Sequence, residues 1–414
     1  MNRWVRLAAA MVGMMMIANL QYSWSLFVKP LIGANHWKLS EVQWAFTFFI
    51  AAETWFMPCT GWMVDKIGVR WFVSVAGLFC GIGWATLGSV HSLSALYIFY
   101  TMAGLGAAMV YCGSVGIGIR WFPDKRGLAA GLITASFGGG AAFFVAMIAH
   151  VIQTAGYRTA FLYTGIGQGL IIILAAQFLK NPAPGMAPVP KPSAKVKTRT
   201  HEQFNTMEML ATPQFYVLYA MMLMMGVGGL MVTAQLAPLA DSFKISRAAL
   251  TLAVTMNPVA NGISRISWGW VSDHLGRTNS MIIAFLLQAI CLASVMSFGR
   301  SSDTAFVVSM ALVIFTWGEI YSLFPSACAD FFGAANVSSN YGFLYSSKGV
   351  ASIIGGGIAA LIFEKTGSWS AVFYGSAALA LFSTLLAIGL TRMPLPRRRV
   401  QTTPMAAAAA AREA

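Results

Sequence analysis

Twelve stretches of about 20 apolar residues follow one another along the chain, and no other feature restricts its fold as strongly. A helix of about 20 apolar residues crosses the roughly 30 Å hydrocarbon layer of a bilayer with its backbone hydrogen bonds satisfied internally. Only 10% of the 414 residues are charged. The sequence therefore predicts an all-α membrane protein with twelve transmembrane helices. They lie near residues 4–28, 41–63, 71–89, 93–118, 128–152, 158–179, 213–240, 248–271, 279–298, 304–327, 341–363 and 369–391.

Positive charge is distributed unevenly between the segments that connect these spans. If the N-terminus is cytoplasmic, 18 of the 27 Lys and Arg residues lie in cytoplasmic segments, 7 in outer loops and 2 inside spans. This is the positive-inside asymmetry of a membrane protein, so it predicts that both termini are cytoplasmic. The membrane topology and contact with lipid therefore account for the net charge of +14, and no nucleic-acid partner is expected.

A polar, proline-rich stretch divides the spans into six and six. It predicts four regions. These are an N-terminal six-helix bundle at 1–179, an extended cytoplasmic linker at 180–212, a C-terminal six-helix bundle at 213–393 and a disordered cytoplasmic tail at 394–414.

The two halves repeat each other. Residues 61–70, Gly-Trp-Met-Val-Asp-Lys-Ile-Gly-Val-Arg, recur at 269–277 as Gly-Trp-Val-Ser-Asp-His-Leu-Gly-Arg, with the glycines and the aspartate 208 positions apart. Glycine runs at 138–140 and 355–357 echo the repeat in the fifth and eleventh spans, where small residues let helices approach closely. The repeated loop and the six-plus-six plan resemble the major facilitator superfamily.

That resemblance implies a fold of two six-helix halves around a central pathway, with the repeated loops acting as a gate. It assigns gating to four charged loop residues, with a solvated tight turn as the alternative for each loop. The gating residues are Asp65, Arg70, Asp273 and Arg277.

A closer resemblance is to the oxalate:formate antiporters, which are related to the monocarboxylate transporters. It is most specific at residues 21–24 (Gln-Tyr-Ser-Trp), 120–127 (Arg-Trp-Phe-Pro-Asp-Lys-Arg-Gly), 212–215 (Thr-Pro-Gln-Phe), 317–325 and 340–343 (Asn-Tyr-Gly-Phe). It implies a carrier in the inner (plasma) membrane of a bacterium that exchanges small carboxylate anions, oxalate and formate. No obligate protein partner is inferred.

Enzyme chemistry is not indicated by the residues. The five histidines are scattered among loops and span ends without metal-ligand spacing, and no phosphate-cradling loop is present in the sequence. We therefore expect no catalytic residue, no metal and no cofactor.

Two cations, Arg265 and Lys348, lie inside predicted spans. A charge at the centre of a membrane helix costs about 2.5 to 3.5 kcal/mol, so it indicates a functional site. At 1.5 Å per residue, Arg265 lies about 12 Å from Asp273 and Lys348 about 10 Å from Tyr341 along their helices, near the depth at which carriers bind substrate. The resemblance places both where the antiporter family carries its substrate-binding cations.

Aromatic residues are expected to complete this site. Tyr341, Tyr345 and Lys348 stand at i, i+4 and i+7 and therefore share one helical face. Spans one, four and ten line the cavity of the resembled fold, and they contribute Tyr22, Tyr111, Trp317 and Tyr321. Trp24, close to the predicted outer end of span one, is expected instead at the membrane interface.

Two acids, Glu53 and Glu319, lie inside spans and leave alternatives open. The cations could form structural ion pairs with them. Glu53 is the repeat counterpart of Asn261, one turn from Arg265, so it could be a counter-ion to Arg265, a proton-coupling group or a neutral buried acid. Glu319 is assigned to a helix–helix contact. A proton-coupled monocarboxylate symporter for a lactate-like acid, with Glu53 as proton site, is the alternative function, and a transporter-like carboxylate receptor is a less favoured one.

Overall fold

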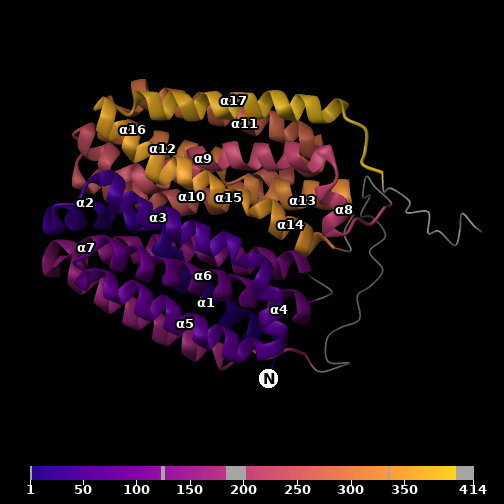
Figure 1. The fold of residues 1–414 in the computed structure, drawn as a ribbon, viewed down its shortest axis with the longest axis horizontal. Helices are drawn as coiled ribbons and strands as arrows, with labels where there is room; N and C mark the ends of the chain where they lie inside the picture. Colours follow the sequence, from indigo (N-terminus) through magenta and orange to yellow (C-terminus); the bar gives the residue numbers. More distant parts are fainter. Residues whose placement is uncertain (1, 123–125, 183–201, 334–335, 398–414) are drawn as a thin grey trace, which may run out of the picture.

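The structure is a computed structural model, and it describes residues 2–122, 126–182, 202–333 and 336–397. All regular secondary structure within these ranges is helical. The two halves of the chain form two helical layers that lie one above the other, with their helices running along the same long axis (Figure 1).

The N-terminal half contains the first six spans. α1 (Arg3–Tyr22) and α2 (Trp24–Asn35) form the first span, and α3 (Leu39–Trp55) and α4 (Met57–Ile67) form the second. The third is α5 (Val69–Thr86) with the short turn η1 (Leu87–Ser89), and the fourth is α6 (Leu93–Trp121). α7 (Arg126–Ala176) contains the fifth and sixth, because Gly156 breaks it with a φ of +83° that favours glycine.

The C-terminal half contains six more spans, several of them interrupted. The seventh span is α9 (Pro213–Ser242), the eighth is α10 (Arg247–Leu275), and the ninth is α11 (Arg277–Ser294) with η2 (Val295–Gly299). The tenth is α12 (Asp303–Trp317) with α13 (Ile320–Phe332). The eleventh consists of α14 (Val337–Tyr345), α15 (Ser347–Ser352), η3 (Ile353–Ile358) and α16 (Ala359–Thr366), and the twelfth is α17 (Ser370–Arg392).

The predicted twelve-span, all-α architecture is confirmed. Nine described helical segments are long and apolar enough to cross a membrane by themselves, and one of them, Gly131–Ala176, contains two passes on either side of Gly156. The second span, α3 with α4, and the eighth, α10, complete the set of twelve.

Glycines bring the two halves into close contact at two related places. A Cβ at Gly138 of α7 would lie 2.7 Å from the carbonyl oxygen of Pro258 in α10, and a Cβ at Gly356 of η3 would meet the hydroxyl of Thr47 in α3. Both glycine runs therefore permit the close helix approach that the sequence predicts. The fifth span packs on the eighth, and the eleventh packs on the second.

Part of the predicted linker is packed rather than extended. Phe204 is buried, its N–H donates to the carbonyl of Phe332 at 2.9 Å, and its own carbonyl accepts from the amides of Asn336 and Asn340. The short helix α8 (Thr206–Leu210) follows directly. The remainder of the linker at 183–201 and the tail from residue 398 lie outside the described residues.

Both ends of the described chain lie at one end of the molecule. α1 begins there, α17 ends there, and α4, α8 and α14 lie there as well (Figure 1). We call this the terminal end, and the other the distal end.

Candidate functional site

Lys348 forms the centre of a buried polar contact between the two halves. It lies in α15 and is 2% exposed. Its Nζ donates to Glu53 Oε2 of α3 at 3.0 Å, to Gln21 Oε1 of α1 at 3.3 Å and to Tyr345 Oη of α14 at 3.4 Å. An ammonium group has three N–H donors. Each donor of Lys348 therefore already has an acceptor in the protein.

Arg265 is held differently and has donors to spare. Its Nε donates to Asn261 Oδ1, one turn earlier on α10, at 3.0 Å. Its guanidinium carbon lies 4.4 Å from the centroid of the Tyr321 ring, and Lys348 Nζ lies 6.0 Å from the same centroid. The two terminal amino groups of Arg265 have no hydrogen-bond acceptor among the described residues. Both cations therefore lie near one tyrosine ring. Among the described residues, Arg265 has a planar pair of N–H donors, its fork, without an acceptor, whereas Lys348 has all its donors occupied.

Of the alternatives for Glu53, the counter-ion relation to Arg265 is not the one that the structure shows. Glu53 is 3% exposed and pairs with Lys348 instead. The repeat places Glu53 at the position equivalent to Asn261, but α10 packs on α7, whereas α15 and η3 pack on α3. The close approach at Gly349 and Gly356 brings Lys348, rather than Arg265, to the carboxylate.

Glu319 is not a counter-ion to either cation. It lies in the break between α12 and α13, is fully buried, and neither of its carboxyl oxygens has a hydrogen-bond partner among the described residues. An isolated buried carboxylate is costly, so a neutral acid is the form that this environment favours.

Aromatic side chains connect the cations to one another. Trp317 and Tyr321 have ring centroids 5.4 Å apart, Tyr321 and Tyr345 6.2 Å, and Tyr345 and Tyr341 5.7 Å. This row contains the four C-terminal aromatic residues that the sequence assigns to the site. Trp317 and Tyr345 are buried, and the other two are half-buried.

Tyr22 of α1 and Tyr111 of α6 face the row from the N-terminal half. Both cations act electrostatically on both hydroxyls. The six predicted aromatic residues are therefore brought around Arg265 and Lys348, and two of them, Tyr321 and Tyr345, have a cation over their rings. Gln21, which also contacts Lys348, was not predicted as a site residue; its only sequence signal is its place in the Gln-Tyr-Ser-Trp motif.

Trp24 does not lie at a membrane interface, so that expectation is wrong. It is fully buried, its Nε1 donates to Gln43 Oε1 at 3.1 Å, and its ring stacks on Tyr100 at 4.4 Å. The reason is that α2 extends the first span to Asn35, so Trp24 lies well inside the bundle.

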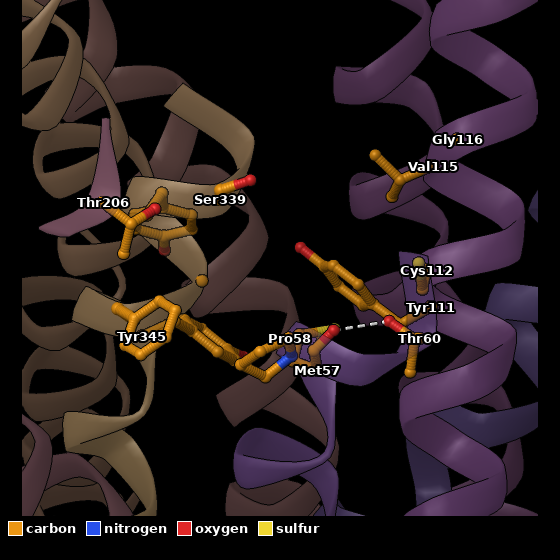
Figure 2. Close-up of a pocket in the computed structure, with 13 residues that line it drawn as sticks. Met57, Pro58, Thr60, Tyr111, Cys112, Val115, Gly116, Thr206, Ser339 and Tyr345 are labelled. Carbon is orange, nitrogen blue, oxygen red and sulfur yellow. Dashed lines mark hydrogen bonds between the residues drawn. The ribbon is translucent and has the colours of Figure 1, made fainter. Parts of the chain in front are cut away.

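A cavity of about 570 Å³ leads from the terminal end towards the cations. Figure 2 shows Thr60 and Tyr111 on its N-terminal side and Thr206 and Ser339 on its C-terminal side. Tyr345 lines the cavity and also contacts Lys348. The cavity therefore connects the terminal end to the polar site through this tyrosine.

The distal end is closed by contacts between the halves. The backbone N–H and the hydroxyl of Ser40 each donate to the carboxylate of Glu364 at 2.7 Å. Deeper, Gln43 Nε2 donates to the carbonyl of Ala234 at 2.7 Å, and Thr47 Oγ1 donates to the carbonyl of Ser352 at 2.9 Å. Among the described residues, these contacts hold the two halves together at the distal end, whereas the cavity lies towards the terminal end.

The predicted gating residues are placed in part. Arg277 contacts Ser272 and lies 3.8 Å from Asp330, so these contacts stay within the C-terminal half. Arg70 is exposed, and the side chains of Asp65 and Asp273 lie outside the described residues.

Comparison with known proteins identifies the class. The family profile of the Major Facilitator Superfamily matches residues 8–234 and 216–412, once for each half. The chain belongs to the major facilitator superfamily, so it is a multi-pass membrane transporter and not an enzyme.

Several of its relatives are named as carriers of small acids. The chain is 37% identical over 396 residues, 96% of its own length and 92% of the relative's, to the oxalate:formate antiporter of Oxalobacter formigenes. It is 23% identical over 376 residues to apicoplast pyruvate carrier 1 of Toxoplasma gondii, covering 76% of this chain and 68% of that one. It is 23% identical over 370 residues to human monocarboxylate transporter 11, with 87% and 77% covered. The predicted family resemblance is confirmed.

Proposed function

We propose that this protein exchanges small carboxylate anions across a membrane, with oxalate and formate as its substrates. The observation that carries the proposal is the placement of Arg265 and Lys348 around one tyrosine ring, next to a cavity that is lined by Tyr345 and lies towards the terminal end. The relative from Oxalobacter formigenes supports the choice of substrates.

The chemistry of the two cations suits a small planar carboxylate. The free fork of Arg265 matches a carboxylate bidentately, whereas Lys348 supplies a compact charge on a flexible stem. The tyrosine rings around them exclude water and strengthen these interactions. Transport then requires the distal contacts to break and the terminal cavity to close as the two halves rock around the site.

Orientation follows from charge. We assign the terminal end to the cytoplasm and the protein to the inner membrane of a bacterium, because positively charged connecting segments gather at that end. The structure then faces inward. Asp65 and Arg70 lie in α4 and α5 on either side of Gly68, and Asp273 and Arg277 lie in α10 and α11 on either side of Gly276. We assign all four to closure of the cytoplasmic end in the outward-facing state.

Counterflow distinguishes exchange from its alternatives. Proteoliposomes loaded with formate are expected to take up labelled oxalate, and empty proteoliposomes are not. Uptake of a monocarboxylate driven by a pH gradient alone, without internal anion, would support the proton-coupled symporter instead. Saturable binding without any counterflow would identify a receptor.

Glu364→Gln is expected to weaken the distal closure. The substitution removes a carboxylate that accepts two hydrogen bonds from Ser40, and charge-assisted bonds are about twice as strong as neutral ones. We expect a several-fold faster reaction of a cysteine placed at the buried position Ala234 with an impermeant maleimide added at the distal side. The five native cysteines would first be replaced, so that the cysteine at position 234 is the one that reacts.

Asp241→Asn is the matched control for this variant. Asp241 pairs with Lys29 at 3.0 Å, but both side chains are exposed, by 48% and 70%. Exposed pairs contribute about 0 to 1 kcal/mol, so this control should change labelling little. Equal labelling rates in the two variants would show that Glu364 does not hold the distal end closed.

A further inference from the structure

We propose that Glu53 is a built-in carboxylate that occupies Lys348 in place of substrate, and that a dicarboxylate displaces it only as Glu53 takes up a proton. This inference rests on the proposed function and names the residue that sets the charge of the accepted anion. Its starting point is the contact of 3.0 Å between Glu53 Oε2 and Lys348 Nζ, with both side chains almost fully buried.

The two cations present unequal surfaces to an arriving anion. The terminal amino groups of Arg265 have no protein acceptor in the described part of the chain, so a first carboxylate group can bind there without displacing anything. Lys348 has all three donors occupied, by Glu53, Gln21 and Tyr345. A second carboxylate group can reach Lys348 only by replacing one of these acceptors, and Glu53 is the one with the same charge as the substrate.

The charges then decide which anions fit. Arg265 and Lys348 contribute two positive charges and ionised Glu53 one negative charge, so the empty site has a net charge of +1. Formate neutralises it and leaves the Glu53–Lys348 pair intact. Oxalate would leave a buried net charge of −1, which is costly in a low-dielectric site. One proton on Glu53 restores neutrality.

The proton comes from the aqueous phase through the cavity and returns to it when oxalate leaves. Import of oxalate(2−) with one proton in exchange for formate(1−) moves no net charge across the membrane. Other groups around Glu53 do not replace it as the acceptor. The charged group beside it is Lys348, and the titratable ones are the phenols of Tyr22, Tyr100, Tyr111 and Tyr345.

Calorimetry tests this inference on the purified full-length carrier in detergent. Titrations with oxalate and with formate in buffers of different ionisation enthalpy count the protons taken up on binding. For the native protein we expect about one proton per oxalate and about none per formate, and an oxalate affinity that falls by up to tenfold per unit rise in pH. Oxalate affinity falls as pH rises because oxalate binds the form of the protein in which Glu53 is protonated, and this form becomes rarer.

Glu53→Gln is expected to bind oxalate without proton uptake and with an affinity that no longer depends on pH. Glu53→Asp keeps an ionisable group and should keep the proton count, and Glu319→Gln, which removes the other buried acid, should keep it too. Formate binding and a monodisperse elution profile verify that each variant is folded.

Two results overturn the inference while leaving the proposed function intact. They are oxalate binding by the native protein without proton uptake, and an unchanged proton count in Glu53→Gln. If neither oxalate nor formate binds the native protein saturably, the proposed function fails, and the inference fails with it.

Discussion

Lys348→Gln is expected to abolish oxalate exchange and to destabilise the protein at the same time. Lys348 is the cation that the second carboxylate group of oxalate requires, so we expect its loss to lower oxalate affinity about 100-fold, as for a desolvated charge-assisted contact. The same substitution leaves Glu53 buried without its cation. Breaking a buried ion pair by removing one partner costs about 3 to 5 kcal/mol. Labelled-oxalate uptake and thermal unfolding measure the two effects.

The double variant Lys348→Gln/Glu53→Gln separates these effects. It removes both charges of the buried pair and leaves two amides that can hydrogen-bond to each other, so we expect its unfolding temperature to return towards the native value. Oxalate exchange should not return. Recovery of exchange in the double variant, or native exchange in the single one, would show that Lys348 is a structural partner of Glu53 and not a substrate ligand.

The fold could be predicted from the sequence because the bilayer imposes length and apolarity on every span. Twelve apolar stretches and a repeat at 208 positions were sufficient for the number of helices and the two halves. The interruptions within spans could not be predicted. The break at Gly318 and Glu319 between α12 and α13 falls inside one apolar stretch, and the apolar composition of that stretch gives no sign of it. The fifth and sixth spans were predicted separately, and the positive φ of Gly156 is the break between them in α7.

The sequence pointed to residues that the structure places near one another, but it did not predict their contacts. Helical spacing correctly grouped Tyr341, Tyr345 and Lys348, because spacing within one helix determines which side chains share a face. The partner of Glu53 depends on which helices of opposite halves touch. The repeat relates α3 to α10 but does not say that α3 packs on α15, so symmetry pointed to Arg265 and the structure pairs Glu53 with Lys348. Trp24 was misplaced for a similar reason, because the end of its span was set too early.

Arg265→Lys is the second substitution with a large expected effect, although it conserves charge. The guanidinium lies 4.4 Å from the centre of the Tyr321 ring. Among the described residues its Nε alone has an acceptor, Asn261, which leaves its two terminal amino groups for substrate. Lysine offers neither the planar fork nor equivalent stacking. We expect the affinities for oxalate and for formate to fall together, by about 10- to 100-fold, because both anions use this fork first. Competition binding with each anion measures this.

Tyr321→Phe is the matched control, since it keeps the ring beneath the guanidinium and removes only the hydroxyl. If the ring face positions Arg265, this variant should retain affinity within a few-fold, because cation–π attraction does not require the hydroxyl. Native affinity for both anions in Arg265→Lys would contradict the assigned order of binding. Lys348 would then be the first point of contact, and Glu53 would have to leave it for a monocarboxylate as well as for a dicarboxylate. Formate and oxalate would in that case show the same dependence on pH.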